Sequence, residues 1–459
     1  MNMPMAEALK PVIESAHVPG IGPGLRSRLT LLGKRWSFAR DVATLGAGTA
    51  AAQIFTIAAA PVITRLYTPN DLGVLGLFTS FLSVATVATS LKYELGIVSA
   101  ADEQQAVDLT SISILLSLPL SIVAGGLLSA AIRLGWFGFH DIPGYAALLM
   151  VPTLVLTGVF TTLRYWMIRR ERFGLISQTF VAQQATRSIS QIILGALHTG
   201  GGGLLFGELI GRAIGVQSML RQAWPALRKG FLSDRYREKL RVLRTNFKLP
   251  VYSLPSSLID NLAANMTLPL LVQLYGSRAG GHFALVQKVL AVPLGLIAFS
   301  VADAFHSRLA QCARQNPEQM LSLFRRTSAG LFIIGFLPAL ALGLIGPQLF
   351  GFVFGEQWAA AGTMAALCAP WFLAQFVVSP LSRLVFVLHG QESKLIYDIL
   401  LLVSMFFVYT SALSRGWPLL QTVWAFTLVN TGCYVLYYFI LHRIVAKSTP
   451  ATIPEPTLS

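Results

Sequence analysis

The chain has 459 residues, of which 54% are hydrophobic and 12% charged, and its formal net charge is +15. A soluble domain carries about 25% charged residues, so the composition excludes an ordinary soluble protein and indicates a membrane protein. On a soluble chain this positive charge would suggest nucleic-acid binding. In a membrane protein, basic cytoplasmic loops explain it, and we expect no nucleic-acid partner.

About twelve apolar segments are long enough to cross a hydrocarbon core of about 30 Å, which takes about 20 helical residues. The predicted spans are 42–67, 72–90, 106–134, 145–167, 174–197, 203–219, 250–275, 281–306, 327–350, 358–388, 395–413 and 417–441. No apolar core of signal-peptide length precedes the first span. The predicted organisation is a cytoplasmic tail, a six-helix lobe, a basic cytoplasmic linker, a second six-helix lobe and a second tail, at 1–40, 41–220, 221–248, 249–444 and 445–459.

The basic residues divide the loops into two sides of the membrane. One side holds most of the lysines and arginines, in the N-terminal tail, after alternate spans and above all in the linker 221–248. The other side holds only Arg65, Arg133, Arg278 and Arg415. A missed span would invert every later loop, so the split supports twelve spans with both termini in the cytoplasm.

The chain also repeats itself. The segment Pro61-Val-Ile-Thr-Arg-Leu-Tyr67 aligns without gaps on Pro269-Leu-Leu-Val-Gln-Leu-Tyr275, 208 residues later, and in this register Gly73 falls on Gly281. Six spans separate the copies, so they share one orientation. Parallel halves with a substrate site at their interface are a recurring transporter plan. We therefore predict an all-α polytopic membrane protein, with two pseudo-symmetric lobes around a central cavity.

Charged residues remain inside the predicted spans, where each costs roughly 3 kcal/mol on insertion scales and usually marks a functional site. The basic ones are Arg164, Arg187, Arg212, Lys288 and Arg383, and the acidic ones are Glu208, Asp260, Asp303 and Asp398. A guanidinium can donate two parallel hydrogen bonds to phosphate oxygens. A basic cavity therefore favours an anionic substrate such as a diphosphate, whereas buried carboxylates could carry a coupling proton or sodium ion.

Polar residues recur every three or four positions in three spans, which places them on helix faces. These residues are Thr49, Gln53 and Thr56 in the first span, Thr179, Gln183, Gln184, Arg187 and Gln191 in the fifth, and Ser253, Ser257, Asn261 and Asn265 in the seventh. Such a face is unfavourable against lipid, so we expect it to line a water-filled cavity. Hydrogen bonding between packed helices is the alternative.

The sixth span carries a glycine at every fourth residue from Gly203 to Gly215, which predicts close helix packing. Glu208 and Arg212 lie beside it, either as an i,i+4 ion pair or as part of the site. The predicted substrate-binding residues are Gln53, Gln183, Gln184, Arg187, Arg212, Asn261, Lys288 and Arg383. The predicted ion-coupling residues are Glu208, Asp260 and Asp303. No cysteine or histidine spacing indicates a metal, and we expect no cofactor and no catalytic residue.

Segments between residues 46 and 109 match a known family pattern. They are Gly46-Ala-Gly-Thr-Ala-Ala-Ala-Gln53, Pro61-Val-Ile-Thr-Arg-Leu-Tyr-Thr-Pro-Asn-Asp-Leu-Gly73, Lys92-Tyr-Glu-Leu-Gly-Ile-Val98 and Ala101-Asp-Glu-Gln-Gln-Ala106. Together they resemble the polysaccharide-transporter (Wzx-type flippase) family of the MOP exporter superfamily. Gly96 stands where the family usually has alanine.

The resemblance implies a flippase that moves an undecaprenyl-diphosphate-linked oligosaccharide across the bacterial inner membrane, for O-antigen, capsule or exopolysaccharide assembly. It also implies alternating access between two lobes, with ion antiport, in contact with membrane lipid and near polysaccharide assembly proteins. Lys92 and Glu94 match the family motif, and we expect a structural or gating role for them at the cytoplasmic mouth.

Three alternatives remain. A multidrug or cation exporter of the same superfamily would favour an acidic cavity. A peptidoglycan-precursor flippase would carry extra spans. A membrane polysaccharide polymerase or ligase would need a large periplasmic loop, but the longest such connections, near 135–144 and 351–356, are short.

Overall fold

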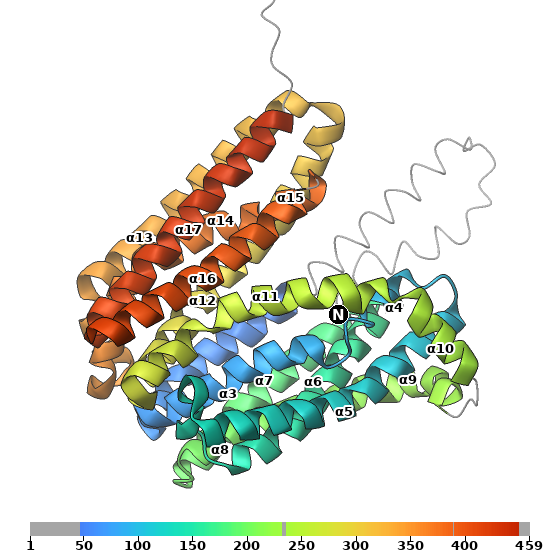
Figure 1. Ribbon diagram of the computed structural model, residues 1–459, viewed down its shortest axis with the longest axis horizontal. Helices are drawn as coiled ribbons and strands as arrows, with labels where there is room; N and C mark the ends of the chain where they lie inside the picture. Colours follow the sequence, from blue (N-terminus) through green and yellow to red (C-terminus); the bar gives the residue numbers. More distant parts are fainter. Residues whose placement is uncertain (1–45, 232–235, 389, 449–459) are drawn as a thin grey trace, which may run out of the picture.

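A computed structural model describes residues 46–231, 236–388 and 390–448 (Figure 1). The first lobe contains an unlabelled helix Gly46–Leu66, then α3 Pro69–Ala88, α4 Leu95–Ser99, α5 Glu103–Leu134, η1 Trp136–Asp141, α6 Tyr145–Arg169, α7 Phe173–Ala196 and α8 Gly201–Ala213. The basic segment that follows holds α9 Val216–Phe231 and α10 Tyr236–Thr245. The second lobe contains η2 Leu249–Ser253, α11 Leu254–Asn265, α12 Thr267–Gln315, η3 Pro317–Gln319, α13 Met320–Phe354, η4 Glu356–Trp358, α14 Ala359–Leu381, α15 Leu384–Val387, α16 Gln391–Arg415 and α17 Leu419–Ser448.

The described residues form helices and no strand, which confirms the predicted all-α fold. Eight of these helices are long and apolar enough to cross a membrane by themselves. The other predicted spans fall on α7, α8, α11 and α12. α7 carries the polar stripe, and α8 and α11 are only 13 and 12 residues long.

The sixth predicted span was wrong at its end. We expected one helix over 203–219, but α8 ends at Ala213, where Ile214 is extended and Gly215 has a φ of +84°. Only glycine adopts that conformation without strain, so the chain turns here. A new helix, α9, begins at Val216 and leads into the basic segment.

The seventh predicted span is likewise divided. A π-helical turn over Leu249–Ser253 precedes α11, and α11 ends at Asn265 before α12 begins. Pro250 and Pro255 remove two backbone donors within this stretch, which explains the irregular hydrogen bonding. Farther on, Gly276 has a φ of +78° and breaks the path of α12.

The helices form two lobes, as predicted. In Figure 1, α5, α6, α7 and α8 belong to one group, and α13, α14, α16 and α17 belong to the other. The groups meet through α3 and α12, which pack against each other. They lie close together at the end that holds η1, and they diverge toward the opposite end, which holds α4, α10 and α15.

The sequence repeat is visible as a reciprocal contact at this meeting point. A Cβ on Gly73 would overlap the carbonyl oxygen of Ser277, and a Cβ on Gly281 would overlap that of Pro69. The offset of 208 residues pairs Pro69 with Ser277 and Gly73 with Gly281. We call two residues that are 208 positions apart repeat mates. The contact of Gly73 with Ser277 is therefore repeated by their mates, Gly281 and Pro69, as a two-fold axis requires.

Hydrogen bonds between the lobes surround this contact. Thr64 accepts a bond from the indole nitrogen of Trp358 at 2.9 Å. Asp141 of η1 accepts from the backbone nitrogen of Ser277 at 2.9 Å and from its hydroxyl at 2.6 Å. Gln273 accepts from the backbone nitrogen of Gly138 at 2.5 Å. We name this region, around Gly73 and Gly281, the apex; it holds the lobes together.

Candidate functional site

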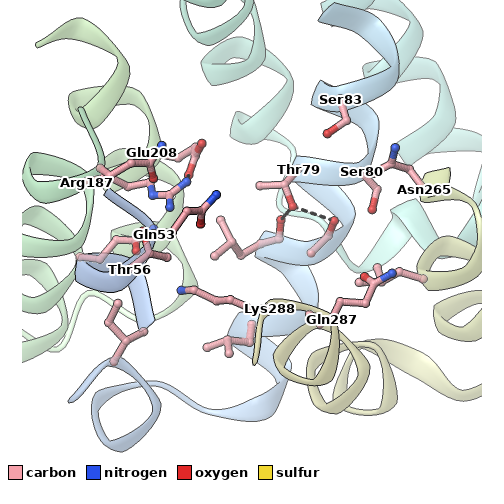
Figure 2. A pocket seen from close by; sticks show the side chains of 18 residues that line it. Gln53, Thr56, Thr79, Ser80, Ser83, Arg187, Glu208, Asn265, Gln287 and Lys288 are labelled. Carbon is pink, nitrogen blue, oxygen red and sulfur yellow. Dashed lines mark hydrogen bonds and ion pairs between the residues drawn. The ribbon is translucent and has the colours of Figure 1, made fainter. Parts of the chain in front are cut away.

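A cavity of about 380 Å³ lies between the lobes, next to the apex (Figure 2). It begins where Gly76 approaches Ala284, whose Cβ would lie 3.2 Å from a Cβ on Gly76. Its polar lining consists of Gln53, Thr56, Thr79, Ser80, Ser83, Gln184, Arg187, Gln191, Glu208, Asn265, Gln287 and Lys288. Because Gly76 and Ala284 are themselves repeat mates, the cavity lies on the pseudo-two-fold axis.

The two halves contribute equivalent positions but different chemistry. The offset of 208 residues pairs Thr79 with Gln287 and Ser80 with Lys288, and all four residues line the cavity. The hydroxyl of Ser80 on α3 is therefore matched by an ammonium group on α12. The cavity is symmetric in position and asymmetric in charge.

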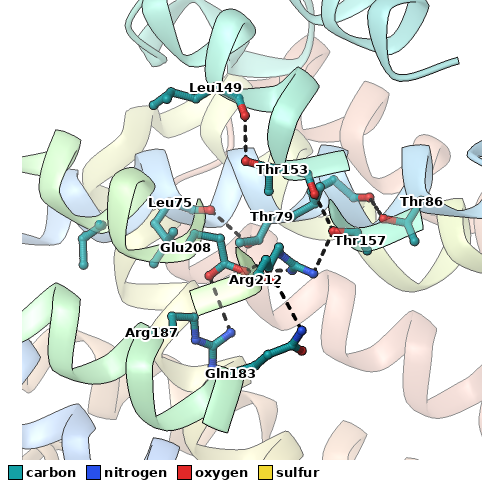
Figure 3. Close-up of polar contacts among 12 residues, drawn as sticks. Leu75, Thr79, Thr86, Leu149, Thr153, Thr157, Gln183, Arg187, Glu208 and Arg212 are labelled. Carbon is teal, nitrogen blue, oxygen red and sulfur yellow. Dashed lines mark hydrogen bonds and ion pairs between the residues drawn. The ribbon is translucent and has the colours of Figure 1, made fainter. Parts of the chain in front are cut away.

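Glu208 of α8 is the centre of the charged network (Figure 3). The residue is only 2% exposed. Its carboxylate accepts from the Nε and Nη2 of Arg212 at 3.1 and 2.7 Å, and it lies 3.5 Å from the Nη1 of Arg187. A buried carboxylate is unfavourable unless it is paired and hydrogen-bonded, and two guanidinium groups meet that need here.

The two arginines differ in their hydrogen bonds and in their position relative to the cavity. Arg212 donates to Glu208 and also to the hydroxyl of Thr157 on α6 at 3.0 Å, and its carbonyl accepts from Gln183. It lies behind Glu208 and outside the cavity lining. Arg187 lines the cavity and makes the longer contact to Glu208. Arg187 is thus the guanidinium that can meet a ligand.

The glycine ridge of α8 explains this geometry and confirms the predicted close packing. A Cβ on Gly211 would overlap Arg187, and a Cβ on Gly207 would overlap Gln191. The polar stripe of α7 therefore lies directly on α8, and Gln191 donates to the carbonyl of Leu204 at 3.1 Å. Gln184, Arg187 and Gln191 of α7 also line the cavity.

Lys288 extends from α12 toward Arg187 and Glu208 (Figure 2). Its charge interacts with both groups through space. Within the described part of the chain, its amine makes no ion pair with another side chain. Arg187, Arg212 and Lys288 together outweigh the single carboxylate of Glu208, so this end of the cavity is net positive.

The structure brings together five of the residues predicted for the site, namely Gln53, Gln184, Arg187, Glu208 and Lys288. The other predicted residues lie elsewhere. Gln183 is buried against α8, Asn261 donates to the carbonyl of Ser257 within α11, and Asp260 pairs with Lys394. Arg383 lies at the turn between α14 and α15. Asp303 is on α12, and its side chain lies outside the described residues.

The two family-motif residues also lie away from the cavity. Glu94 is 4% exposed and accepts from the hydroxyl of Ser90 at 2.5 Å. Lys92 has a φ of +66° in the turn after α3. Nearby, Arg169 donates to the carbonyls of Ile97, Val98 and Ala100 at 2.9 to 3.2 Å, so it caps α4. These contacts join α4 to the end of α6.

Sequence reasoning missed several cavity residues on α3 and α12, namely Thr79, Ser80, Ser83 and Gln287. The signal existed. Thr79, Ser80 and Ser83 lie at helical spacing, and the repeat places Gln287 and Lys288 on Thr79 and Ser80. Thr157, the partner of Arg212, stands on a different helix, and nothing in its local sequence marks it.

The two-lobed helical arrangement is the fold of solved transporters of the MOP superfamily. Residues 62–362 match the family model described as polysaccharide biosynthesis protein, so the chain belongs to this family. Comparison with curated protein sequences gives no match.

Solved structures share the fold at low sequence identity. The lipid II flippase MurJ in an inward closed conformation is 13% identical, with a TM-score of 0.67 over 88% of this chain and 90% of that one. An inward-facing multidrug resistance MATE family transporter is 15% identical, with a TM-score of 0.63 over 86% and 95%. A MOP superfamily transporter from Pyrococcus furiosus is 15% identical, with a TM-score of 0.52 over 90% and 96%.

Proposed function

We propose that this chain is a flippase that translocates an undecaprenyl-diphosphate-linked oligosaccharide across the bacterial inner membrane by alternating access. The substrate would serve O-antigen, capsule or exopolysaccharide assembly. Both termini and the basic segment 221–248 would lie in the cytoplasm, and lobes 41–220 and 249–444 would rock about the cavity. In this orientation the apex is periplasmic, and the lobes diverge toward the cytoplasm.

The observation that carries the proposal is the net positive cavity on the pseudo-two-fold axis. Arg187 and Lys288 face it from opposite lobes, and amide and hydroxyl groups line the rest. A diphosphate offers oxygens to a guanidinium fork and an ammonium group at once. Ligand pockets range over about 300–1,000 Å³, so a cavity of 380 Å³ suits the diphosphate head group rather than a whole oligosaccharide.

Glu208 supports a simple exchange on binding. It holds Arg187 by the longer of its two arginine contacts, and a diphosphate can compete for that guanidinium. Glu208 is also the cavity carboxylate through which we propose ion antiport. A cation exporter is the rival function, but a positively charged cavity disfavours a cationic substrate.

Complementation tests the function. The chain would be expressed in a bacterium that lacks its own flippase, and lipid-linked glycan would be labelled at the periplasmic face of the inner membrane. We expect glycan to reach that face only when the chain is present. Glycan that reaches it in either case but stays unpolymerised or unattached would place the protein after translocation and favour a polymerase or ligase.

Within this assay, Arg187→Ala should reduce glycan export about 10- to 150-fold, because a hydrogen bond to a charged group contributes about 1.5–3 kcal/mol. Export by Arg187→Lys should lie between that of the wild type and that of Arg187→Ala, because an ammonium group keeps the charge but cannot donate two parallel hydrogen bonds. Arg164→Ala is the matched control, because Arg164 is exposed on α6 beside Tyr165 and outside the cavity. Normal export by Arg187→Ala at wild-type protein levels would remove Arg187 from the site.

A further inference from the structure

A second charged cluster lies in the C-terminal lobe, away from the cavity. The ammonium of Lys394, near the start of α16, lies 2.8 Å from one carboxylate oxygen of Asp260 on α11. It lies 2.6 Å from each oxygen of Asp398, one turn further along α16. One cation is therefore held by two carboxylates from two helices, at distances that use its three donors.

The surroundings favour a cation at this point. Asp398 is 4% exposed. The ring of its neighbour Tyr397 stacks on that of Tyr437, with centroids 4.3 Å apart, and both tyrosines are buried. A carboxylate in such a place is unfavourable without a partner of opposite charge. Asp260 is about half exposed and adds a second negative charge within reach of the same ammonium.

The same contact adds an ionic bond to the packing of α11, which lies against α3 and α16. Ala263 is the one buried residue of α11. The helix begins at the π-helical turn at Leu249–Ser253 and is separated from α12 by Met266 alone. α11 also carries Asn265 into the cavity. The bond from Lys394 to Asp260 thus ties a wall of the cavity to α16.

We propose that Lys394 is the resident cation of the C-terminal lobe: its tethered ammonium occupies the position between Asp260 and Asp398 that a free monovalent cation would otherwise fill. The C-terminal lobe therefore needs no free cation to hold α11 in position. Asp260, a sequence candidate for ion coupling, is already neutralised by the chain. The proposal stands on contacts outside the cavity and does not depend on the identity of the substrate.

Thermal unfolding of the purified full-length protein tests this directly, in sodium chloride and in choline chloride at equal ionic strength. The wild type should unfold at the same temperature in both salts. Lys394→Gln leaves two uncompensated carboxylates, so it should unfold several degrees lower in choline chloride. Sodium should restore part of that loss in proportion to the logarithm of its concentration, because only the folded state presents the pair.

Three further variants sharpen the result. Lys394→Arg keeps a tethered cation and should show no sodium effect. Lys394→Gln combined with Asp260→Asn and Asp398→Asn removes the need for a cation, so it should be more stable than Lys394→Gln and indifferent to sodium. If Lys394→Gln cannot be purified, recovery of the protein in this triple variant supports the same conclusion. Lys447→Gln, at an exposed lysine near the end of α17, is the matched control.

Two outcomes would overturn the proposal. One is a wild-type protein that sodium stabilises specifically and that loses the effect in Asp398→Asn, since the site would then hold a free cation. The other is a Lys394→Gln protein as stable as the wild type in both salts, because the carboxylates would then need no resident cation and the contact would be an ordinary surface ion pair.

Discussion

Gly281→Val should hold the apex open and turn the cavity toward the proposed periplasmic side. A Cβ at this position would overlap the carbonyl oxygen of Pro69, which is backbone and cannot rotate away. α3 and α12 must therefore separate, and the bonds from Trp358 to Thr64 and from Ser277 to Asp141 must lengthen or break. Overpacking costs about 1–3 kcal/mol, which changes the ratio of the two conformations about 5- to 150-fold.

Cysteine labelling measures this shift. Ser80→Cys places a thiol on the cavity wall, in a chain whose natural Cys312, Cys368 and Cys433 have been replaced by serine. A membrane-impermeant maleimide added from the periplasmic side should label this thiol slowly in the otherwise unchanged chain. It should label the Gly281→Val variant at a rate raised by the same 5- to 150-fold.

Gly126→Val is the matched control. Gly126 also lies within a long membrane helix, α5, but a Cβ there meets no atom within 4 Å. Its labelling rate should equal that of the parent. Equal rates for Gly281→Val and Gly126→Val, with both proteins properly inserted, would show that the contact between α3 and α12 does not close the cavity.

The apex also shows why the repeat was readable from sequence. Close helix contact across an axis needs small residues on both sides. A larger side chain at either Gly73 or Gly281 would therefore separate the lobes. The same register put Gln53 opposite Asn261, yet only Gln53 lines the cavity. A position where two backbones touch accepts only glycine, whereas a cavity wall accepts many polar residues. The shared glycines therefore predicted the repeat contact more reliably than the shared polar residues predicted the cavity.

Membership of the cavity could be predicted only in part, and the reason is geometric. Successive helical residues point about 100° apart, so Gln183 and Gln184 face different neighbours although both are glutamines. The polar stripe of α7 allowed either a cavity or a helix contact. The structure divides it, with Thr179 and Gln183 buried and Gln184 and Arg187 on the cavity.

Partners supplied by distant helices were beyond sequence reasoning. Lys394 reads as a cytoplasmic loop residue, because it precedes an apolar segment on the basic side. Its role appears only when α11 brings Asp260 within 2.8 Å. The same holds for Thr157, which meets Arg212 from α6. Charge and periodicity located the unusual residues, whereas tertiary packing decided which of them meet.

Glu208→Gln should produce the largest loss of stability of any single change in the cavity. The carboxylate is almost fully buried and neutralises both Arg187 and Arg212. An amide of the same size removes the negative charge and leaves two guanidinium groups facing each other. Breaking a buried ion pair costs about 3–5 kcal/mol. We expect the lower end, because the arginine side chains are 23% and 28% exposed and water can solvate them in part.

Thermal unfolding in detergent, together with the yield of monodisperse protein, measures this loss. The double variant Glu208→Gln, Arg212→Met should regain part of it, because it also removes one of the two guanidinium groups that the carboxylate neutralised. Glu356→Gln, at an exposed glutamate at the start of η4, should behave as the wild type. If Glu208→Gln matched Glu356→Gln in stability, hydration would suffice for both arginines, and the carboxylate would serve the transported ligand or ion rather than the fold.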